Sequence, residues 1–73
     1  MNTKINEAVR KNVIYYRKTN NLTQAELAEK IGVSHDFIRQ AEAPNVQKNF
    51  SIKTIEKLAD EFEIDYIKLF ENR

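Results

Sequence analysis

The chain has 73 residues and a formal net charge of +1, and this length allows one domain with a modest apolar core. With no cysteine and a single histidine it can form neither a disulfide nor a zinc cluster, so we expect no metal and no other cofactor. Residues 1 to 4 lack the apolar core of a signal peptide, and no apolar run is long enough to cross a membrane, so we expect a cytoplasmic protein.

The first predicted element is a helix over about residues 4 to 19. Val9, Val13 and Tyr16 recur at intervals of three and four, which gives this helix an apolar face, and Asn20-Asn21 ends it. Residues 1 to 20 carry five basic side chains and one acidic side chain, whereas residues 51 to 73 carry four basic and six acidic side chains. Such polarity can orient a small domain on nucleic acid, or it can reflect ordinary salt pairing on helix surfaces.

Two short helices joined by a tight turn are predicted over about residues 23 to 43. Thr23 and Glu26 have the reciprocal spacing of a capping box and begin the first of these helices. Its apolar side chains recur at helical intervals: Leu27, Ala28 and Ile31. Gly32, the only glycine in the chain, ends it, because a helix end often needs a residue that tolerates a positive φ.

The second helix of the pair begins after Ser34, which can cap it. Ile38 and Ala41 face inward at helical spacing, and Phe37 is expected to pack against the following loop. Four polar side chains are then left to project outward: His35, Asp36, Arg39 and Gln40. A short helix with such an outer face suits the major groove of DNA, so the pair is typical of a helix-turn-helix.

Two more helices are predicted between about residues 51 and 71. Residues 43 to 50 contain a proline, two asparagines and no helical periodicity, which indicates a loop. Ser51 caps the next helix, whose apolar stripe is Ile52, Ile55, Leu58, Ala59 and Phe62. Asp65 caps a last short helix with an inward face of Tyr66, Leu69 and Phe70. The prediction is therefore an all-α fold of five helices in one domain over residues 1 to 73.

Many spaced positions together resemble the Cro/C1-type (XRE-like) family of bacterial and phage DNA-binding domains. In the first half they are Leu22-Thr23-Gln24, Leu27-Ala28, Ile31-Gly32-Val33-Ser34, Ile38 and Glu42. In the second half they are Ser51-Ile52, Leu58-Ala59, Phe62, Ile64-Asp65 and Leu69-Phe70. The resemblance implies a compact lambda-repressor-like fold, double-stranded DNA as the partner, and a role like that of small stand-alone repressors or restriction-modification controller proteins.

The resemblance also implies roles for individual residues. Base edges would be read by His35, Asp36, Arg39 and Gln40. Gln24 would contact a phosphate, as the glutamine at that position does in the family. From their own chemistry, further phosphate contacts are expected at Thr23 and Ser34 and, in the loop, at Asn45, Lys48 and Asn49 with Gln47. Gln24 would also brace the recognition helix, and Arg17 with Glu42 would form a partly buried structural ion pair. For the loop residues, solubility alone explains the composition equally well, and an exposed helix face remains the alternative for the outer residues of the recognition helix.

The chemistry of the four outer residues refines these roles. The fork of Arg39 matches guanine O6 and N7, Gln40 can pair with adenine, and His35 can donate to guanine N7 or contact a phosphate. Asp36 is repelled by phosphates unless it accepts from cytosine N4 or holds Arg39 in place. Compensation of the helix dipole is its alternative role.

The sequence departs from the family pattern in three places. Ala43-Pro44 replaces the usual Asn-Gly after the recognition helix, so an expected asparagine contact is lost unless Asn45 supplies it. Glu63 stands where a glycine usually closes the fourth helix, so we expect a left-handed backbone there. Ala41 replaces a larger apolar residue, and Phe50 is the candidate to fill the space.

An exposed isoleucine suggests how two copies associate. If Tyr66 faces inward, Ile67 points about 100° away from it, and Ile67 with Ile64 then forms a small patch for an isologous homodimer. An antitoxin, or another protein-interaction module that represses its own operon, is the alternative function. We expect no enzyme and no catalytic residue, because no carboxylate pair, His/Cys cluster or glycine-rich phosphate loop stands in a catalytic arrangement in the sequence.

Overall fold

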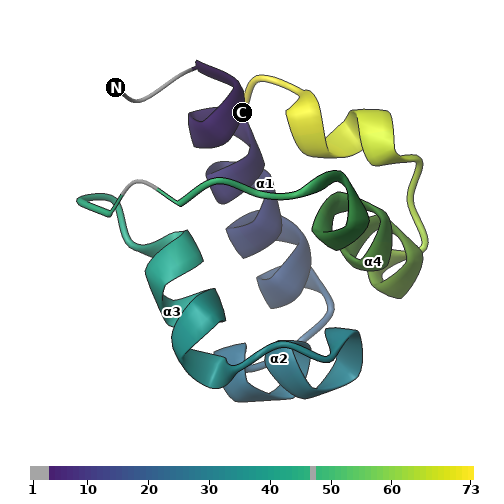
Figure 1. The fold of residues 1–73 in the computed structure, drawn as a ribbon. Coiled ribbons are helices and arrows are strands. Elements are labelled where there is room, and N and C mark those ends of the chain that lie inside the picture. Colours follow the sequence, from purple (N-terminus) through teal and green to yellow (C-terminus); the bar gives the residue numbers. More distant parts are fainter. Residues whose placement is uncertain (1–3, 47) are drawn as a thin grey trace.

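The computed structural model describes residues 4–46 and 48–73, and every regular element in these ranges is helical (Figure 1). The elements are α1 (Lys4–Thr19), α2 (Gln24–Ile31), α3 (His35–Glu42), α4 (Ile52–Phe62) and the 3-10 helix η1 (Tyr66–Phe70). The all-α prediction is confirmed, but the last of the five expected helices is a 3-10 helix. None of the described helices is both long and apolar enough to cross a membrane.

The elements surround α1, as Figure 1 shows. The α2–α3 pair lies across one end of α1, α4 packs beside it, and η1 returns toward its N-terminal half. The loop that joins α3 to α4 crosses α1 in this view. The outer face of α3 is therefore presented by a helix that packs on α1 and α2.

Local side-chain caps begin four of the five elements, as the sequence predicts. Thr23 Oγ1 accepts from the Glu26 amide at 3.0 Å while the Thr23 amide donates to Glu26 Oε1 at 2.8 Å, which completes a capping box. The hydroxyls of Ser34 and Ser51 accept from backbone amides three residues later, at 3.0 and 3.1 Å. Asp65 accepts from the Ile67 amide at 3.0 Å. Each cap is worth about 1 kcal/mol of helix stability.

Left-handed residues end three of the α-helices. Gly32 has φ 73°, Glu63 has φ 56°, and Asn21, just after α1, has φ 58°. The expected conformation of Glu63 is confirmed, and its amide donates to Asp60 O at 3.2 Å. A side chain in this region costs about 1 kcal/mol relative to glycine. By contrast, α3 ends at Ala43 with an extended backbone, because Pro44 disfavours a helical conformation at the residue before it.

The apolar core lies where the five elements meet. Its most deeply buried apolar side chains come from all five elements and are Val9, Val13, Leu27, Ile38, Leu58 and Leu69. The Tyr16 ring stacks on Phe62 with centroids 5.7 Å apart. Phe37 meets Phe50 edge to face at 6.4 Å, which confirms that Phe37 packs against the loop. Phe50 is half-buried and packs on the core beside the small Ala41.

Two expectations about buried faces are wrong. Tyr66 and Phe70 do not face inward with Leu69, because they are 57% and 39% exposed. In a 3-10 helix successive residues are rotated by about 120°, so Phe70 points away from the buried side of Leu69. Tyr66 precedes Leu69 by three residues, so the winding does not account for its exposure; its ring packs edge to face on Phe70 at 6.4 Å. Ile52 belongs to the apolar stripe of α4 by spacing, but as its first residue it extends past the core and is 81% exposed.

A buried asparagine, which the sequence analysis did not identify, attaches η1 to α1. Asn12 is fully buried, and its Nδ2 donates to the carbonyls of Leu69 and Glu71 at 2.9 and 2.8 Å. Its Oδ1 accepts from Arg73 Nε at 2.5 Å, and the Arg73 guanidinium lies 3.7 Å from the Tyr15 ring centroid. The end of η1 is thus held on α1, whereas Tyr66 begins the element away from this attachment.

Candidate nucleic-acid interface

The exposed side of α3 carries the four polar residues that the sequence singles out. His35, Asp36 and Arg39 are exposed and Gln40 is half-buried, while Ile38 and Ala41 face the core. This division follows from helical spacing, because 35, 36, 39 and 40 lie three and four residues apart on one side. The structure therefore places all four side chains on one accessible surface.

A carboxylate connects the members of this surface. Asp36 Oδ1 accepts from Arg39 Nη2, and Asp36 Oδ2 accepts from Gln40 Nε2 at 2.8 Å. Gln40 Oε1 in turn accepts from Lys48 Nζ at 3.3 Å, and this ammonium lies 5.1 Å from the Phe37 ring centroid. The loop after α3 thus contributes a cation to the face of α3.

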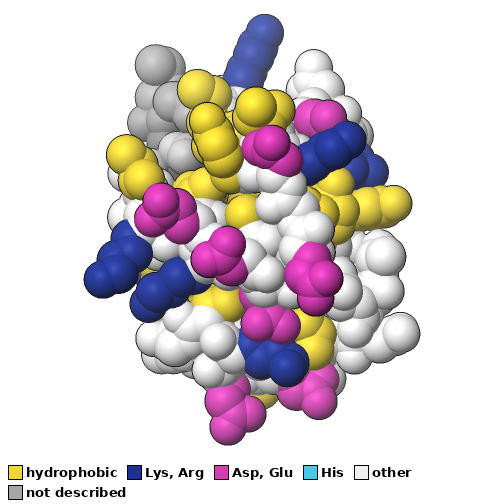
Figure 2. Space-filling model, turned by 90° about the vertical axis from the view of Figure 1, so that its right-hand side faces the viewer, with side chains coloured by type: hydrophobic (Ala, Val, Ile, Leu, Met, Phe, Trp, Pro, Cys, Tyr) yellow, Lys and Arg dark blue, Asp and Glu magenta, His cyan; other side chains and the backbone are white. Residues whose placement is uncertain are grey.

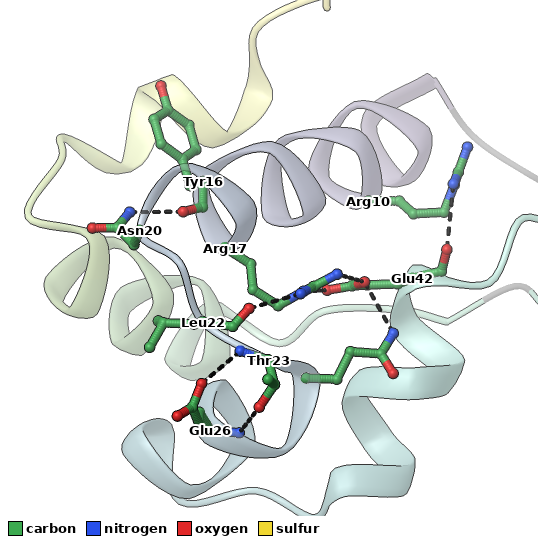
Figure 3. Close-up of polar contacts among 9 residues, drawn as sticks. Arg10, Tyr16, Arg17, Asn20, Leu22, Thr23, Glu26 and Glu42 are labelled. Atoms are coloured by element: carbon green, nitrogen blue, oxygen red, sulfur yellow. Dashed lines mark hydrogen bonds and ion pairs between the residues drawn. The ribbon is translucent and has the colours of Figure 1, made fainter.

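The inner end of α3 is held by a bidentate ion pair (Figure 3). Arg17 Nε and Nη2 donate to the two carboxylate oxygens of Glu42 at 2.6 and 2.9 Å, and Arg17 Nη1 donates to Leu22 O at 2.8 Å. The side chains of Arg17 and Glu42 are only 12% and 6% exposed. Gln24 Nε2 adds a bond to Glu42 Oε1 at 3.0 Å. The structure therefore joins α1, the start of α2 and the end of α3 through one carboxylate.

Arg10 makes a further link to α3, which the sequence analysis missed. Its Nη1 donates to the Glu42 carbonyl at 3.4 Å, and its Nε and Nη2 donate to Glu7 at 2.9 and 3.0 Å. The side-chain hydrogen bonding between Arg10 and Glu7 lowers the pKa of the Glu7 carboxyl and raises the pKa of Arg10. The spacing of three residues within α1 predicts the pair of Arg10 with Glu7. Nothing in the sequence predicts the contact of Arg10 with Glu42.

The positive charge of α1 is not all available to a ligand of α3. Arg10 and Arg17 are paired with carboxylates, and Lys4 and Lys11 line a depression with Arg73 beside the chain's C-terminal end. At α3 the cationic groups are Arg39 and Lys48. The excess of basic residues in positions 1 to 20 of the sequence therefore overstates how much positive charge lies near α3.

The expected phosphate-contact residues fall into two groups. Thr23, Gln24 and Ser34 lie at the N-termini of α2 and α3, where helix amides attract anions. Asn45, Lys48 and Asn49 lie in the loop after α3; Lys48 bonds to Gln40, whereas Asn49 Oδ1 accepts from Asn6 Nδ2 of α1 at 2.8 Å. Gln47 lies outside the described residues. Asn6 is a further neighbour of the loop, and no pattern in the sequence singles it out.

Comparison with known proteins agrees with this arrangement. A helix-turn-helix family model, of the Cro/C1 type, matches residues 13–69, which include α2, α3, α4 and both residues of the Arg17–Glu42 pair. No curated protein matches the chain.

Proposed function

The chain belongs to the Cro/C1-type, or XRE, helix-turn-helix family of DNA-binding regulators, and we propose that it is a sequence-specific transcriptional regulator of the cytoplasm. It acts by binding and not by catalysis, as a homodimer on a pseudo-palindromic operator with α3 of each copy in the major groove. The observation that carries the proposal is the exposed polar face of a helix whose buried end is braced by Arg17, Gln24 and Glu42.

The base contacts in this proposal come from the exposed face of α3. Arg39 offers two parallel N–H groups to guanine O6 and N7, and Gln40 offers a donor and an acceptor to adenine. His35, at the start of the helix, donates to guanine N7 or to a phosphate. A pair of such bidentate contacts in each half-site is enough to prefer one sequence strongly, because each is worth about 1–3 kcal/mol.

The phosphate contacts position α3 in the groove. The cap hydroxyls of Thr23 and Ser34 accept from backbone amides, and each retains its own proton to donate to a phosphate. The N-terminal amides of α2 beside Gln24 add a further anion site. Lys48 uses one of three N–H donors for Gln40 and has two more, while Asn45 and Asn49 extend the contact along the loop.

The homodimer is supported by an apolar surface away from α3. Ile67 is 56% exposed. Its chain neighbour Tyr66 lines a groove of about 420 Å³ together with Ile52, Ile55, Glu56 and Phe70, and Ile67 is not part of that lining. Ile64 is half-buried and lines a neighbouring depression with Tyr66. Figure 2 shows this side of the molecule, with hydrophobic side chains mainly in its upper half and acidic ones both among them and below them.

Isologous pairing of this surface gives a dimer of suitable size. The longest extent of one copy is 29 Å, and the two recognition helices need a separation near one turn of DNA, about 34 Å. Two copies joined at the α4 and η1 side therefore have room to present both α3 helices to successive major grooves. In such a dimer the exposed Glu56 carboxylate of each copy would lie at the rim of the groove, in contact with solvent.

Selection of bound sites from random duplexes tests the proposal. The expected result is a pseudo-palindromic sequence with guanine and adenine at fixed positions in each half-site, bound far more tightly than unrelated duplexes. Equal and weak binding to every duplex in the pool would refute a sequence-specific regulator.

The exposed apolar surface supports one alternative, an antitoxin or other protein-interaction module that also represses its own operon. In that case the surface of Ile52, Tyr66, Ile67 and Phe70 receives a different protein. A toxin gene adjacent to the gene for this chain would favour it. A stable homodimer that excludes the toxin would count against it.

A further inference from the structure

We propose that Asp36 is a positioning residue, which sets the base preference of α3 through Arg39 and Gln40 without contacting a base itself. The proposal rests on the function proposed above. Its basis is that one carboxylate, at the centre of the exposed face, accepts from both of the long polar side chains that follow it on the helix.

Both oxygens of Asp36 are used within α3. Oδ1 accepts from Arg39 Nη2, three residues on, and Oδ2 accepts from Gln40 Nε2, four residues on, at 2.8 Å. Helical geometry places residues at these spacings on the same side, so the contacts need no change in backbone. Arg39 and Gln40 lose rotational freedom before any ligand arrives, which reduces the entropy cost of ordering them on DNA.

Gln40 gains a defined amide orientation from this arrangement. Its nitrogen donates to Asp36 and its oxygen accepts from Lys48 Nζ at 3.3 Å, so a rotation that exchanges the two ends of the amide would break both bonds. A primary amide has two N–H groups and an oxygen with two lone pairs. One donor and one acceptor therefore remain, and these are the groups that adenine N7 and N6 require.

Arg39 is oriented by the same carboxylate. The Arg39 side chain is 63% exposed, and a guanidinium has five N–H donors, so the bond to Asp36 leaves an edge for guanine O6 and N7. Pairing with Arg39 also offsets the negative charge of Asp36, which would otherwise stand unpaired near the phosphates. The Asp36 carboxylate still repels the phosphates of DNA of any sequence. Removal of Asp36 should therefore strengthen non-specific binding and weaken discrimination between bases.

The test compares Asp36→Ala with Glu29→Ala, which removes the same charge from an exposed position on α2. Binding is measured to the selected site, to every single-base variant of it, and to an unrelated duplex. For Asp36→Ala we expect discrimination to fall about 5-fold or more at both positions that Arg39→Ala and Gln40→Ala affect, because bidentate contacts carry that preference. Affinity for the unrelated duplex should rise about 2-fold or more. Glu29→Ala should keep the wild-type discrimination.

Other outcomes would overturn the proposal. Loss of preference at one cytosine position, with the Arg39 and Gln40 positions unchanged, would mean that Asp36 reads a base directly. Equal discrimination by Asp36→Ala and Glu29→Ala would mean that Asp36 has no positioning role. If the wild-type protein itself prefers no sequence, the proposed function fails and this inference with it, whereas the first two outcomes leave the function standing.

A measurement on the protein without DNA makes the inference independent of any operator. We expect nitrogen relaxation of the Gln40 side-chain amide to show restricted motion about its Cγ–Cδ bond in the wild type and freer motion in Asp36→Ala. Asp36→Asn, which keeps the shape and one acceptor oxygen, should restore part of this order and of the base discrimination. If Asp36→Ala leaves the relaxation of the Gln40 amide unchanged, the carboxylate does not hold the amide.

Discussion

The guanidinium of Arg17 donates to both carboxylate oxygens of Glu42, at 2.6 and 2.9 Å, and so joins α1 to the last residue of α3. The Glu42 side chain is 6% exposed, so this carboxylate depends on its protein partners for the interactions that water would otherwise supply. The position of the recognition helix is therefore coupled to an ion pair that lies away from its exposed face.

Arg17→Ala should destabilise the fold. It leaves the buried Glu42 carboxylate without its main partner, which typically costs about 3–5 kcal/mol when a buried pair is broken. We expect a clearly lower Tm by calorimetry, with weaker DNA binding as a result of the damaged fold. Arg39→Ala is the matched control, because the Arg39 side chain is 63% exposed and its pair with Asp36 lies in solvent.

The Arg39→Ala variant should show the opposite behaviour. Its Tm should stay near that of the wild type, while preference for the correct base at one position of each half-site should fall by about 1–3 kcal/mol. Titration against a selected site and a one-base variant measures this loss. If Arg39→Ala unfolds the protein and Arg17→Ala changes only base preference, the assigned faces of α3 are wrong.

Binding to duplex DNA should weaken steeply with salt. If a dimer neutralises about four to six phosphates, release of counterions implies a slope of roughly −4 to −5 for log K against log salt. Fluorescence anisotropy at several salt concentrations, with one selected duplex, measures the slope. A slope near zero would contradict phosphate contacts from Lys48 and from the ends of α2 and α3.

Ile67→Asp should shift the protein from dimer to monomer. A carboxylate at this position would have to be buried in the proposed interface without a partner, which is unfavourable. Ile5→Asp is the control, because Ile5 is similarly exposed, at 62% against 56%, but lies on α1. Sedimentation measures both variants. A wild-type protein that stays monomeric, both alone and on a palindromic site, would rule out the dimer.

Asn12→Ala should lower the free energy of unfolding by about 1–3 kcal/mol, because it leaves the carbonyls of Leu69 and Glu71 without their buried donor. Denaturant titration measures the change. Asn20→Ala removes an exposed side-chain bond to the Tyr16 carbonyl and should change stability by no more than about 0.5 kcal/mol. Equal effects of the two substitutions would mean that Asn12 does not secure η1.

Several features of the site are predictable because they depend on residues three or four apart. The capping box of Thr23 and Glu26, the caps at Ser34 and Ser51 and the left-handed Gly32 all follow from local spacing. The exposed face of α3 follows in the same way, and spacing also makes contacts from Asp36 to Arg39 and Gln40 possible. The likeness to known DNA-binding domains rests on these same spaced positions.

The helices, their ends and the polar face of α3 are thus predictable from local sequence, because backbone hydrogen bonds and caps act over one turn of helix. Apart from the Arg17–Glu42 pair, which the family resemblance implied, the contacts between distant groups are known from the fold alone. Asn12 donates to the carbonyl of a residue 57 positions later, and Lys48, in the loop after α3, donates to Gln40 of α3. The exposure of Tyr66 and Phe70 belongs to this second class. It depends on how η1 lies on α1 and, for Phe70, on the winding of η1 as a 3-10 helix, and the spacing of apolar residues predicts neither.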